Sequence, residues 1–311
     1  MMQPLLQQRF RGLLMGAAIA ESLASGIGAS GIGASGIGAA GTGNVASLQI
    51  LAHLLAYEFW DCQGFPQGDE SLPSRQDLRW PVIQTCLWTL ITHDCPVWRQ
   101  QRIQQIAAAY SVSASGLQRF SYLLSRRLLG QSISPADLLS PILPKESPPA
   151  KTLFQTVLQG LTQRTDLRTA ETLIHQAQGL EDLDRAIALA CYCWISSPHL
   201  FSQALARSCT VGAQPLVPLL TGALAGVSVG QAHIPCLVHS PFLAQIRLSA
   251  LPQPPLADSP LDQLCRSADY LFYRWAGHGQ TPSDPQPLEP VITAPGQLRP
   301  RDLQLSLQDW F

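Results

Sequence analysis

Charged residues are scarce in this chain of 311 residues, since Asp, Glu, Lys and Arg make up 13% of it. About 25% is usual for a globular protein. The net charge is -1, and no block of Lys and Arg occurs. Because binding to phosphate backbones requires clustered basic side chains, we expect no nucleic-acid partner. The hydrophobic fraction, 46%, is ordinary and supports a large core.

A long uninterrupted apolar run is also missing. The first ten residues, MMQPLLQQRF, lack the apolar stretch of a secretory signal. Two long segments without formal charge, 22–57 and 208–246, are broken by a glycine repeat and by prolines respectively. A membrane-spanning helix requires about 20 consecutive apolar residues. We therefore expect a cytoplasmic protein that has no membrane partner.

The cysteines show no C-x-x-C spacing, although there are eight of them. Cys191 and Cys193 are the closest pair, and their spacing points them to different sides of a helix. This pattern favours buried free thiols in a reducing compartment over a metal site or a disulfide framework.

A glycine repeat is the most conspicuous feature that is present. Between Gly26 and Gly41 the chain reads GIGASGIGASGIGAAG, with three overlapping copies of G-x-G-x-x-G. This fingerprint indicates a dinucleotide site only after a strand and with an acidic residue about 20 positions further on. Here the preceding segment has helical spacing, and no acid lies between Glu21 and Glu58. We therefore expect a flexible loop over residues 25–43 that binds no dinucleotide.

The rest of the chain has helical periodicity and no convincing strand. It predicts an all-α domain over residues 6–277 and a tail rich in Pro and Gln over 278–311. Ser134 and Ser259, each followed by Pro, are typical of helix starts, and 142–150 is a proline-rich connector. Further helices are expected at 45–60, 78–92, 97–110, 116–130, 151–163, 170–178, 182–195 and 215–230.

Two stripes of small residues occur at helical spacing. One contains Gly12, Gly16 and Ala20, and the other contains Gly222, Gly226 and Gly230. Small side chains four residues apart allow the backbones of two helices to approach closely. The first helix is therefore expected to pack directly on the helix at 215–230.

Two stretches resemble the ADP-ribosylglycohydrolase family. The family's opening helix has the pattern R-x-x-G-x-x-x-G-x-x-x-G-D-A-x-G, and RFRGLLMGAAIAESLA matches it at Arg9, Gly12 and Gly16. Glu21 stands where the pattern has aspartate. The second stretch, 182–235, matches the family at Phe201, at GALAG (222–226), at Gly230 and at Ile234-Pro235.

The resemblance implies an orthogonal multi-helix bundle that binds two magnesium ions through carboxylates. Family members cleave the glycosidic bond of ADP-ribosylated residues or related ADP-ribose compounds. Glu21 is the only candidate acid here. The positions that carry the family's metal ligands are occupied by residues without carboxylates: Gly43, Asn44, Val45, Ala213, Gln214, Pro215 and Leu216.

This departure predicts that the two magnesium ions are absent, because magnesium selects carboxylate oxygens. Asn44 and Gln214 could retain contacts to a ligand. The expected function is that of an inactive family member acting as a binding or interaction protein. Its partner would be another protein, a second copy of the chain or an ADP-ribose-like ligand.

Two alternatives stay open. One is an ADP-ribosyl hydrolase with an altered site, in which Glu21 acts as a general base. The other is a structural subunit without a small-molecule pocket. Glu21 also has a purely structural interpretation, in which it ends the first helix at a solvated edge.

Overall fold

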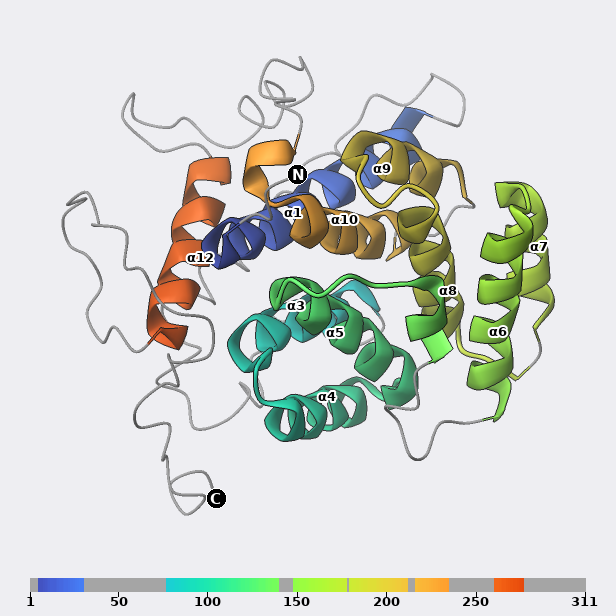
Figure 1. The fold of residues 1–311 in the computed structure, drawn as a ribbon, viewed down its shortest axis with the longest axis horizontal. Helices are drawn as coiled ribbons and strands as arrows, with labels where there is room; N and C mark the ends of the chain where they lie inside the picture. Colours follow the sequence, from blue (N-terminus) through green and yellow to red (C-terminus); the bar gives the residue numbers. More distant parts are fainter. Residues whose placement is uncertain are drawn as a thin grey trace.

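Every regular element in the described part of the chain is a helix (Figure 1). The computed structural model describes residues 5–30, 77–139, 148–177, 179–211, 216–234 and 260–276. The α-helices are α1 (Leu6–Ser30), α3 (Arg79–Thr92), α4 (Pro96–Tyr110), α5 (Ala114–Leu128), α6 (Pro148–Gln163), α7 (Leu167–Gln176), α8 (Asp182–Ile195), α9 (Phe201–Thr210), α10 (Leu216–Val229) and α12 (Pro260–Trp275). Two short 3-10 helices are η1 (Pro135–Leu139) and η2 (Gln231–His233). The all-α multi-helix bundle expected from the sequence is confirmed.

Two buried helices form the centre of the bundle. In α10 every side chain is buried, because its sequence is apolar on all faces and other helices surround it. α1 runs alongside α10, with α8 and α9 packed on α10 and α12 packed on α1 (Figure 1). The group α3, α4 and α5 lies below this centre, and α6 and α7 cover the outer side of α8. No helix among those described combines the length and apolar content needed to cross a bilayer.

The two glycine stripes meet, as the sequence predicts. A β-carbon placed on Gly16 would overlap the carbonyl oxygen of Gly222 and would lie 3.0 Å from the Cα of Gly226. One placed on Gly12 would overlap the Gly226 carbonyl and would lie 2.9 Å from the Cα of Gly230. The backbones of α1 and α10 are therefore in direct contact, and only glycine fits at these positions. We call this contact the glycine seam.

The structure corrects two expected boundaries. Helix α1 continues to Ser30, so the glycine-rich loop does not begin at residue 25. Helix α6 begins at Pro148, inside the segment expected to be a connector, because proline fits the first turn of a helix. The expected helix 45–60 and the tail lie outside the described residues.

The Ser-Pro pattern at Ser134 also needs correction. It opens the five-residue 3-10 helix η1 rather than an α-helix. The carboxylate of Asp137 accepts hydrogen bonds from the backbone N–H of Ser134 (2.6 Å) and from its hydroxyl (2.9 Å). The Asp137 carboxylate thus accepts the hydrogen bonds at the start of η1, whereas the sequence predicted that Ser134 would be the cap. The second Ser-Pro pattern, at Ser259, does predict an α-helix correctly, because α12 begins at Pro260.

The cysteines of α8 are free and buried, as expected. Burial raises the pKa of Cys191 and of Cys193 to about 12. Thiols with such pKa values stay protonated near neutral pH, so they pack as small apolar groups rather than as nucleophiles or metal ligands.

Candidate functional site

Most residues at the expected metal positions lie outside the described ranges. These are Gly43, Asn44, Val45, Ala213, Gln214 and Pro215. Leu216 opens α10 and is buried. Glu21 is therefore the one polar residue of the set whose surroundings the structure shows.

Glu21 does not end the first helix at a solvated edge. It lies within α1, nine residues before the helix ends at Ser30, and only 3% of it is exposed. Its carboxylate lies 3.6 Å from the guanidinium of Arg79, the first residue of α3. A neighbouring cation allows a carboxylate to be buried, and this explains why the expectation of a solvated edge was wrong.

Arg79 is held in place by a second carboxylate. Asp77 accepts from the Nε (2.9 Å) and Nη2 (2.5 Å) of Arg79 and also from its backbone N–H (3.0 Å). Burial opposes the ionisation of Asp77, but these hydrogen bonds together outweigh burial and lower the pKa of its carboxyl. The Asp77 hydrogen bond raises the pKa of Arg79. The cluster of Glu21, Arg79 and Asp77 is thus a charged link between α1 and the start of α3.

This geometry limits the chemistry of Glu21. A general base must come within hydrogen-bonding reach of the proton that it removes. The Glu21 carboxylate is buried and faces a guanidinium that is itself fixed by Asp77. Within the described ranges, no three His, Cys, Asp or Glu side chains gather closely enough to hold a metal ion.

A second polar region surrounds the C-terminal end of α5, and sequence reasoning missed it. Arg9 of α1 donates to the carbonyl of Leu128 at 2.8 Å. Arg127 donates to the Gln131 carbonyl (3.1 Å) and to the carbonyl (3.2 Å) and hydroxyl (3.1 Å) of Ser228 in α10. Burial and repulsion from Arg127 lower the pKa of Arg9. These arginines satisfy carbonyls at the negative end of the helix and connect it to the two central helices.

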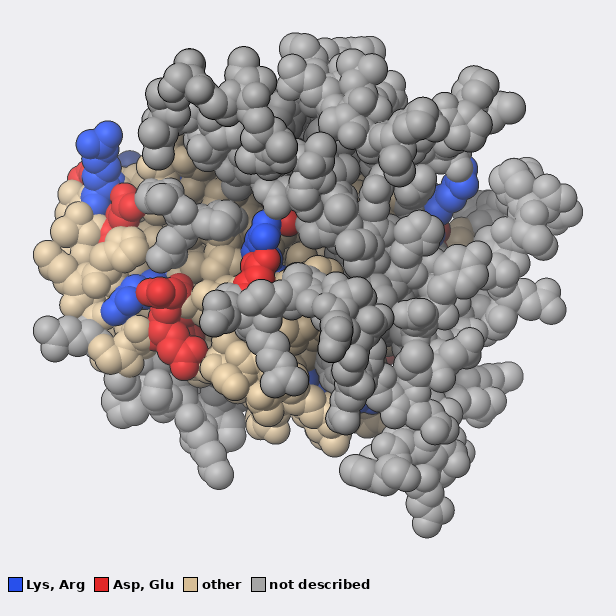
Figure 2. All heavy atoms as spheres, turned by 180° about the vertical axis from the view of Figure 1, so that it is seen from behind, with Lys and Arg blue, Asp and Glu red and all other residues tan. Residues whose placement is uncertain are grey.

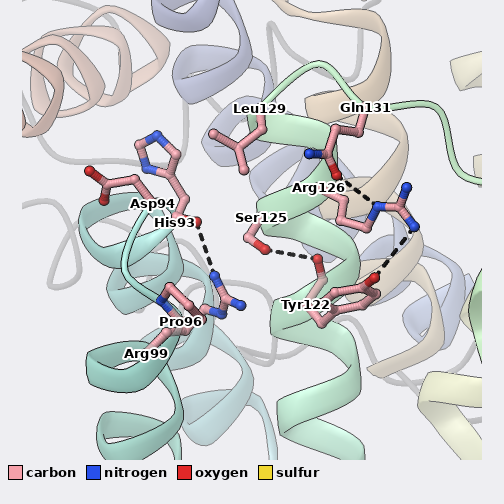
Figure 3. A pocket seen from close by; sticks show the side chains of 9 residues that line it. All are labelled: His93, Asp94, Pro96, Arg99, Tyr122, Ser125, Arg126, Leu129 and Gln131. Carbon is pink, nitrogen blue, oxygen red and sulfur yellow. Dashed lines mark hydrogen bonds between the residues drawn. The ribbon is translucent and has the colours of Figure 1, made fainter. Parts of the chain in front are cut away.

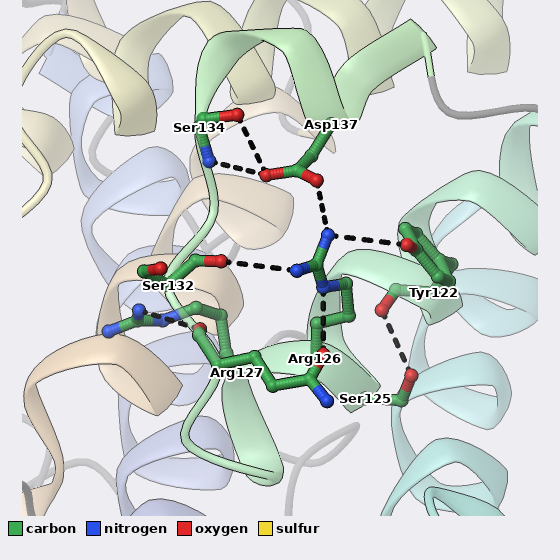
Figure 4. Close-up of polar contacts among 8 residues, drawn as sticks. Tyr122, Ser125, Arg126, Arg127, Ser132, Ser134 and Asp137 are labelled. Atoms are coloured by element: carbon green, nitrogen blue, oxygen red, sulfur yellow. Dashed lines mark hydrogen bonds and ion pairs between the residues drawn. The ribbon is translucent and has the colours of Figure 1, made fainter.

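Arg126 organises the segment that follows α5 (Figure 4). Its guanidinium contacts the carboxylate of Asp137, the hydroxyl of Tyr122 and the carbonyl of Ser132. Asp137 in turn holds Ser134, as described above. Arg126 is therefore committed to structure, and its charge is offset by that of Asp137.

A pocket of about 430 Å³ lies between the start of α4 and the end of α5 (Figure 3). Helix α5 contributes one wall, and the turn from α3 into α4 contributes the other. It is lined by His93, Asp94, Pro96, Arg99, Tyr122, Ser125, Arg126, Leu129 and Gln131.

Arg99 is the most unusual group in this pocket. Only 8% of the residue is exposed, and its Nη1 donates to the carbonyl oxygen of His93 at 3.0 Å. Burial lowers the pKa of Arg99, yet guanidinium groups titrate so far above neutrality that it keeps its charge. The sequence does contain a signal for this residue, because Arg99 stands in the first turn of α4, where the helix dipole disfavours a cation.

His93 lies beside the same pocket but belongs to an aromatic cluster. Its ring is 5.7 Å from that of Phe10 in α1 and 4.8 Å from that of Trp275 in α12. Nδ1 lies 2.7 Å from the carbonyl oxygen of Leu90, which can only accept, so Nδ1 carries the hydrogen. Burial lowers the pKa of His93. The imidazole is therefore neutral at pH 7.

Comparison of this chain with protein-family models, with curated proteins and with solved structures finds no match in any of the three.

Proposed function

We propose that this protein is an inactive relative of the ADP-ribosylglycohydrolases that acts as a binding or interaction protein. The glycine seam carries the proposal. The two stretches that resemble the family's opening helix and its GALAG helix lie about 200 residues apart in the sequence, and they form the central contact of the bundle.

The surroundings of Glu21 support the loss of catalysis. A carboxylate that is shut off from solvent and aligned against Arg79 is well placed to fix helices and poorly placed to activate water. The substitutions at the metal-ligand positions point the same way, since Asn44, Ala213 and Pro215 stand where the family has aspartates and none of them supplies a carboxylate.

The described surface suits a partner that does not depend on charge. On the face in Figure 2, charged side chains of the described residues are few and lie in small groups of both signs. Large apolar side chains are exposed at several sites: Leu5, Val97, Trp98, Leu129, Leu173 and Leu200. A surface of this kind favours association through apolar and neutral polar contacts.

Turnover measurements test the proposal most directly. The full chain would be incubated with magnesium and with ADP-ribosylated arginine, ADP-ribosylated serine or free ADP-ribose derivatives. We expect no metal-dependent release of ADP-ribose above the rate without protein. Turnover that Glu21→Gln abolishes while the protein stays folded would instead establish a hydrolase with an altered site.

Ligand binding distinguishes a binding protein from a structural subunit. We expect ADP-ribose to raise the thermal midpoint, or light scattering to show self-association of the purified chain. A protein that is monomeric, unresponsive to ADP-ribose and inactive would contradict the proposed binding role for these partners.

A further inference from the structure

We propose that the pocket between α4 and α5 binds a small organic anion, whose carboxylate or phosphate group is held by Arg99. This site is separate from the cluster around Glu21 and does not depend on the family resemblance.

The first observation is an arginine that lacks an anionic partner. Arg99 is about nine-tenths buried, and no carboxylate of the described residues lies within ion-pair distance of it. One carbonyl oxygen, that of His93, is its acceptor in the described part of the chain. A guanidinium has five N–H donors in a fixed fork, so most of its hydrogen-bonding capacity is left for another group. Burying such a charge without an anion is costly.

The direction of the side chain supports this site. Figure 3 shows the Arg99 guanidinium reaching across the pocket toward α5, between Pro96 and Tyr122. The planar fork matches the oxygen spacing of carboxylate and phosphate groups, which it can bind through two parallel hydrogen bonds.

The start of α4 adds a positive potential at the same place. Pro96 is the first residue of α4, and no side chain caps this end of the helix. The backbone N–H groups of Val97 and Trp98 therefore have no helical acceptor; these two residues do not line the pocket, and they act on it through the potential of the helix end. Free N–H groups and the helix dipole together favour an anion in front of a helix N-terminus.

The other residues that line the pocket restrict which anions fit it. Arg126 is already offset by Asp137, so it adds little net charge. Asp94 is exposed at the rim and opposes anion binding. Leu129 is 49% exposed and offers an apolar surface at the opposite wall. The volume, about 430 Å³, lies in the range of small-molecule sites. A small anion with a short hydrocarbon part fits these features.

The test uses two probes of known chemistry. Inorganic phosphate and benzoate would be titrated into the full chain by calorimetry, at constant ionic strength set with chloride. Binding of benzoate alone identifies a carboxylate ligand with an apolar part, and binding of phosphate alone identifies a phosphate site. If neither probe binds more tightly than chloride, the proposal is overturned.

Arg99→Met is the decisive variant, and Arg102→Met is its matched control. Methionine keeps the apolar stem of Arg99 but removes the fork, so the affinity should fall at least about tenfold. Arg102 lies on the same helix and stacks on the ring of Trp88, away from the pocket. Its variant should bind as the parent does. Equal binding by Arg99→Met and the parent would overturn the assignment.

A rim variant keeps the test valid if Arg99→Met does not fold. Asp94 is exposed, so Asp94→Asn should leave the fold intact. Removing its negative charge should tighten anion binding about two- to fivefold, with a larger effect at low salt. An affinity that does not change in Asp94→Asn at low salt would show that the probe binds elsewhere.

Discussion

The glycine seam and the arginine-lined end of α5 hold the same central helices by opposite means. At the seam, α1 and α10 touch through backbone atoms, and there is no room for a single added carbon. At the end of α5, the guanidinium groups of Arg9 and Arg127 donate hydrogen bonds to backbone carbonyl oxygens. The acceptors are Leu128 for Arg9, and Gln131 and Ser228 for Arg127. The first contact depends on shape alone, and the second depends on hydrogen bonds and charge.

The difference predicts how each region responds to change. Close-packed backbone cannot move away from an added side chain without shifting a whole helix. Arg127 is only partly buried, so water can replace part of what is lost when its hydrogen bonds are removed. The seam should therefore be the more sensitive region, even though it contains no polar interaction between side chains.

The largest effect is expected from Gly16→Leu or Gly226→Leu. Each leucine would be forced into the backbone of the opposite helix. Overpacking typically costs about 1–3 kcal/mol, and we expect a loss of about 3 kcal/mol or more here because the obstacle is main chain. The free energy of unfolding, from urea denaturation followed by circular dichroism, measures this cost.

Gly160→Ala is the control for the seam. Gly160 also lies inside a helix, α6, but its added carbon would meet a ring carbon of Tyr192 at 3.3 Å rather than backbone. Its stability should change by less than about 1 kcal/mol. If Gly16→Leu is no more damaging than Gly160→Ala, the seam is not the rigid centre of the bundle.

A smaller loss is expected from Arg127→Met at the polar end. The substitution removes hydrogen bonds to Ser228 and Gln131. Losing hydrogen bonds from a charged group at a partly buried site should cost about 1–3 kcal/mol. Arg168→Met on the exposed side of α7 is the control and should change stability by less than about 0.5 kcal/mol. A loss equal to that of Gly16→Leu would contradict the contrast between the two regions.

The seam could be predicted from the sequence, and the polar end could not. Glycines at four-residue spacing in two helical segments leave few ways to bury both stripes, so Gly16 and Gly226 were predictable partners. Helix α8 was predicted with the bounds that the structure shows, because its apolar periodicity and acidic first turn agree. Local patterns of this kind specify local structure well.

Arg127 carries no such pattern, and the place of Arg99 in the first turn of α4 shows only that the helix dipole disfavours its charge. An isolated arginine on a helix is most often solvated, and nothing local shows which distant carbonyl it will reach. The same limit applies to Glu21, whose partner Arg79 lies 58 positions later, across a segment that includes the glycine repeat. Sequence reasoning placed Glu21 at a solvated edge because it could not see a cation brought by another helix.

His93 lies between the central helix α1 and the pocket that Arg99 lines, and its titration should produce a modest pH effect. It contacts Phe10 of α1 and Trp275 of α12, while its carbonyl holds Arg99. Burial lowers its pKa below the ordinary value near 6.5. Between the two pKa values, the imidazole is protonated in the unfolded chain and neutral in the folded chain. The contribution of His93 to the free energy of unfolding is therefore complete above about pH 6.5, and it is lost as the pH falls from there toward the folded-state pKa.

The variant His93→Phe isolates this effect. The parent should lose stability between pH 7 and pH 5.5, and the contribution of His93 to the slope cannot exceed about 1.4 kcal/mol per pH unit, the limit for one proton. His93→Phe should be less dependent on pH in this window, and the exposed His199→Asn should behave as the parent does. Urea midpoints across the pH series measure the slope. An unchanged slope in His93→Phe would mean that another group titrates in this range.

The smallest effect is expected from removing five residues of the glycine repeat. Deleting residues 26–30 or 31–35 produces the same protein, because both read GIGAS. Helix α1 ends at Ser30, within the first unit, and after the deletion the next unit presents the identical sequence to the end of α1. The helix can therefore keep its length, and the change falls on the segment that follows. The closure cost of a chain segment grows only slowly with its length, about 0.6 kcal/mol for each doubling, so stability should change by less than about 0.5 kcal/mol. Insertion of a fourth GIGAS-type block of five residues should change stability equally little in the same urea assay. A loss of more than about 2 kcal/mol would show that the repeat makes specific contacts, and the seam would then not be the main constraint on how α1 is held.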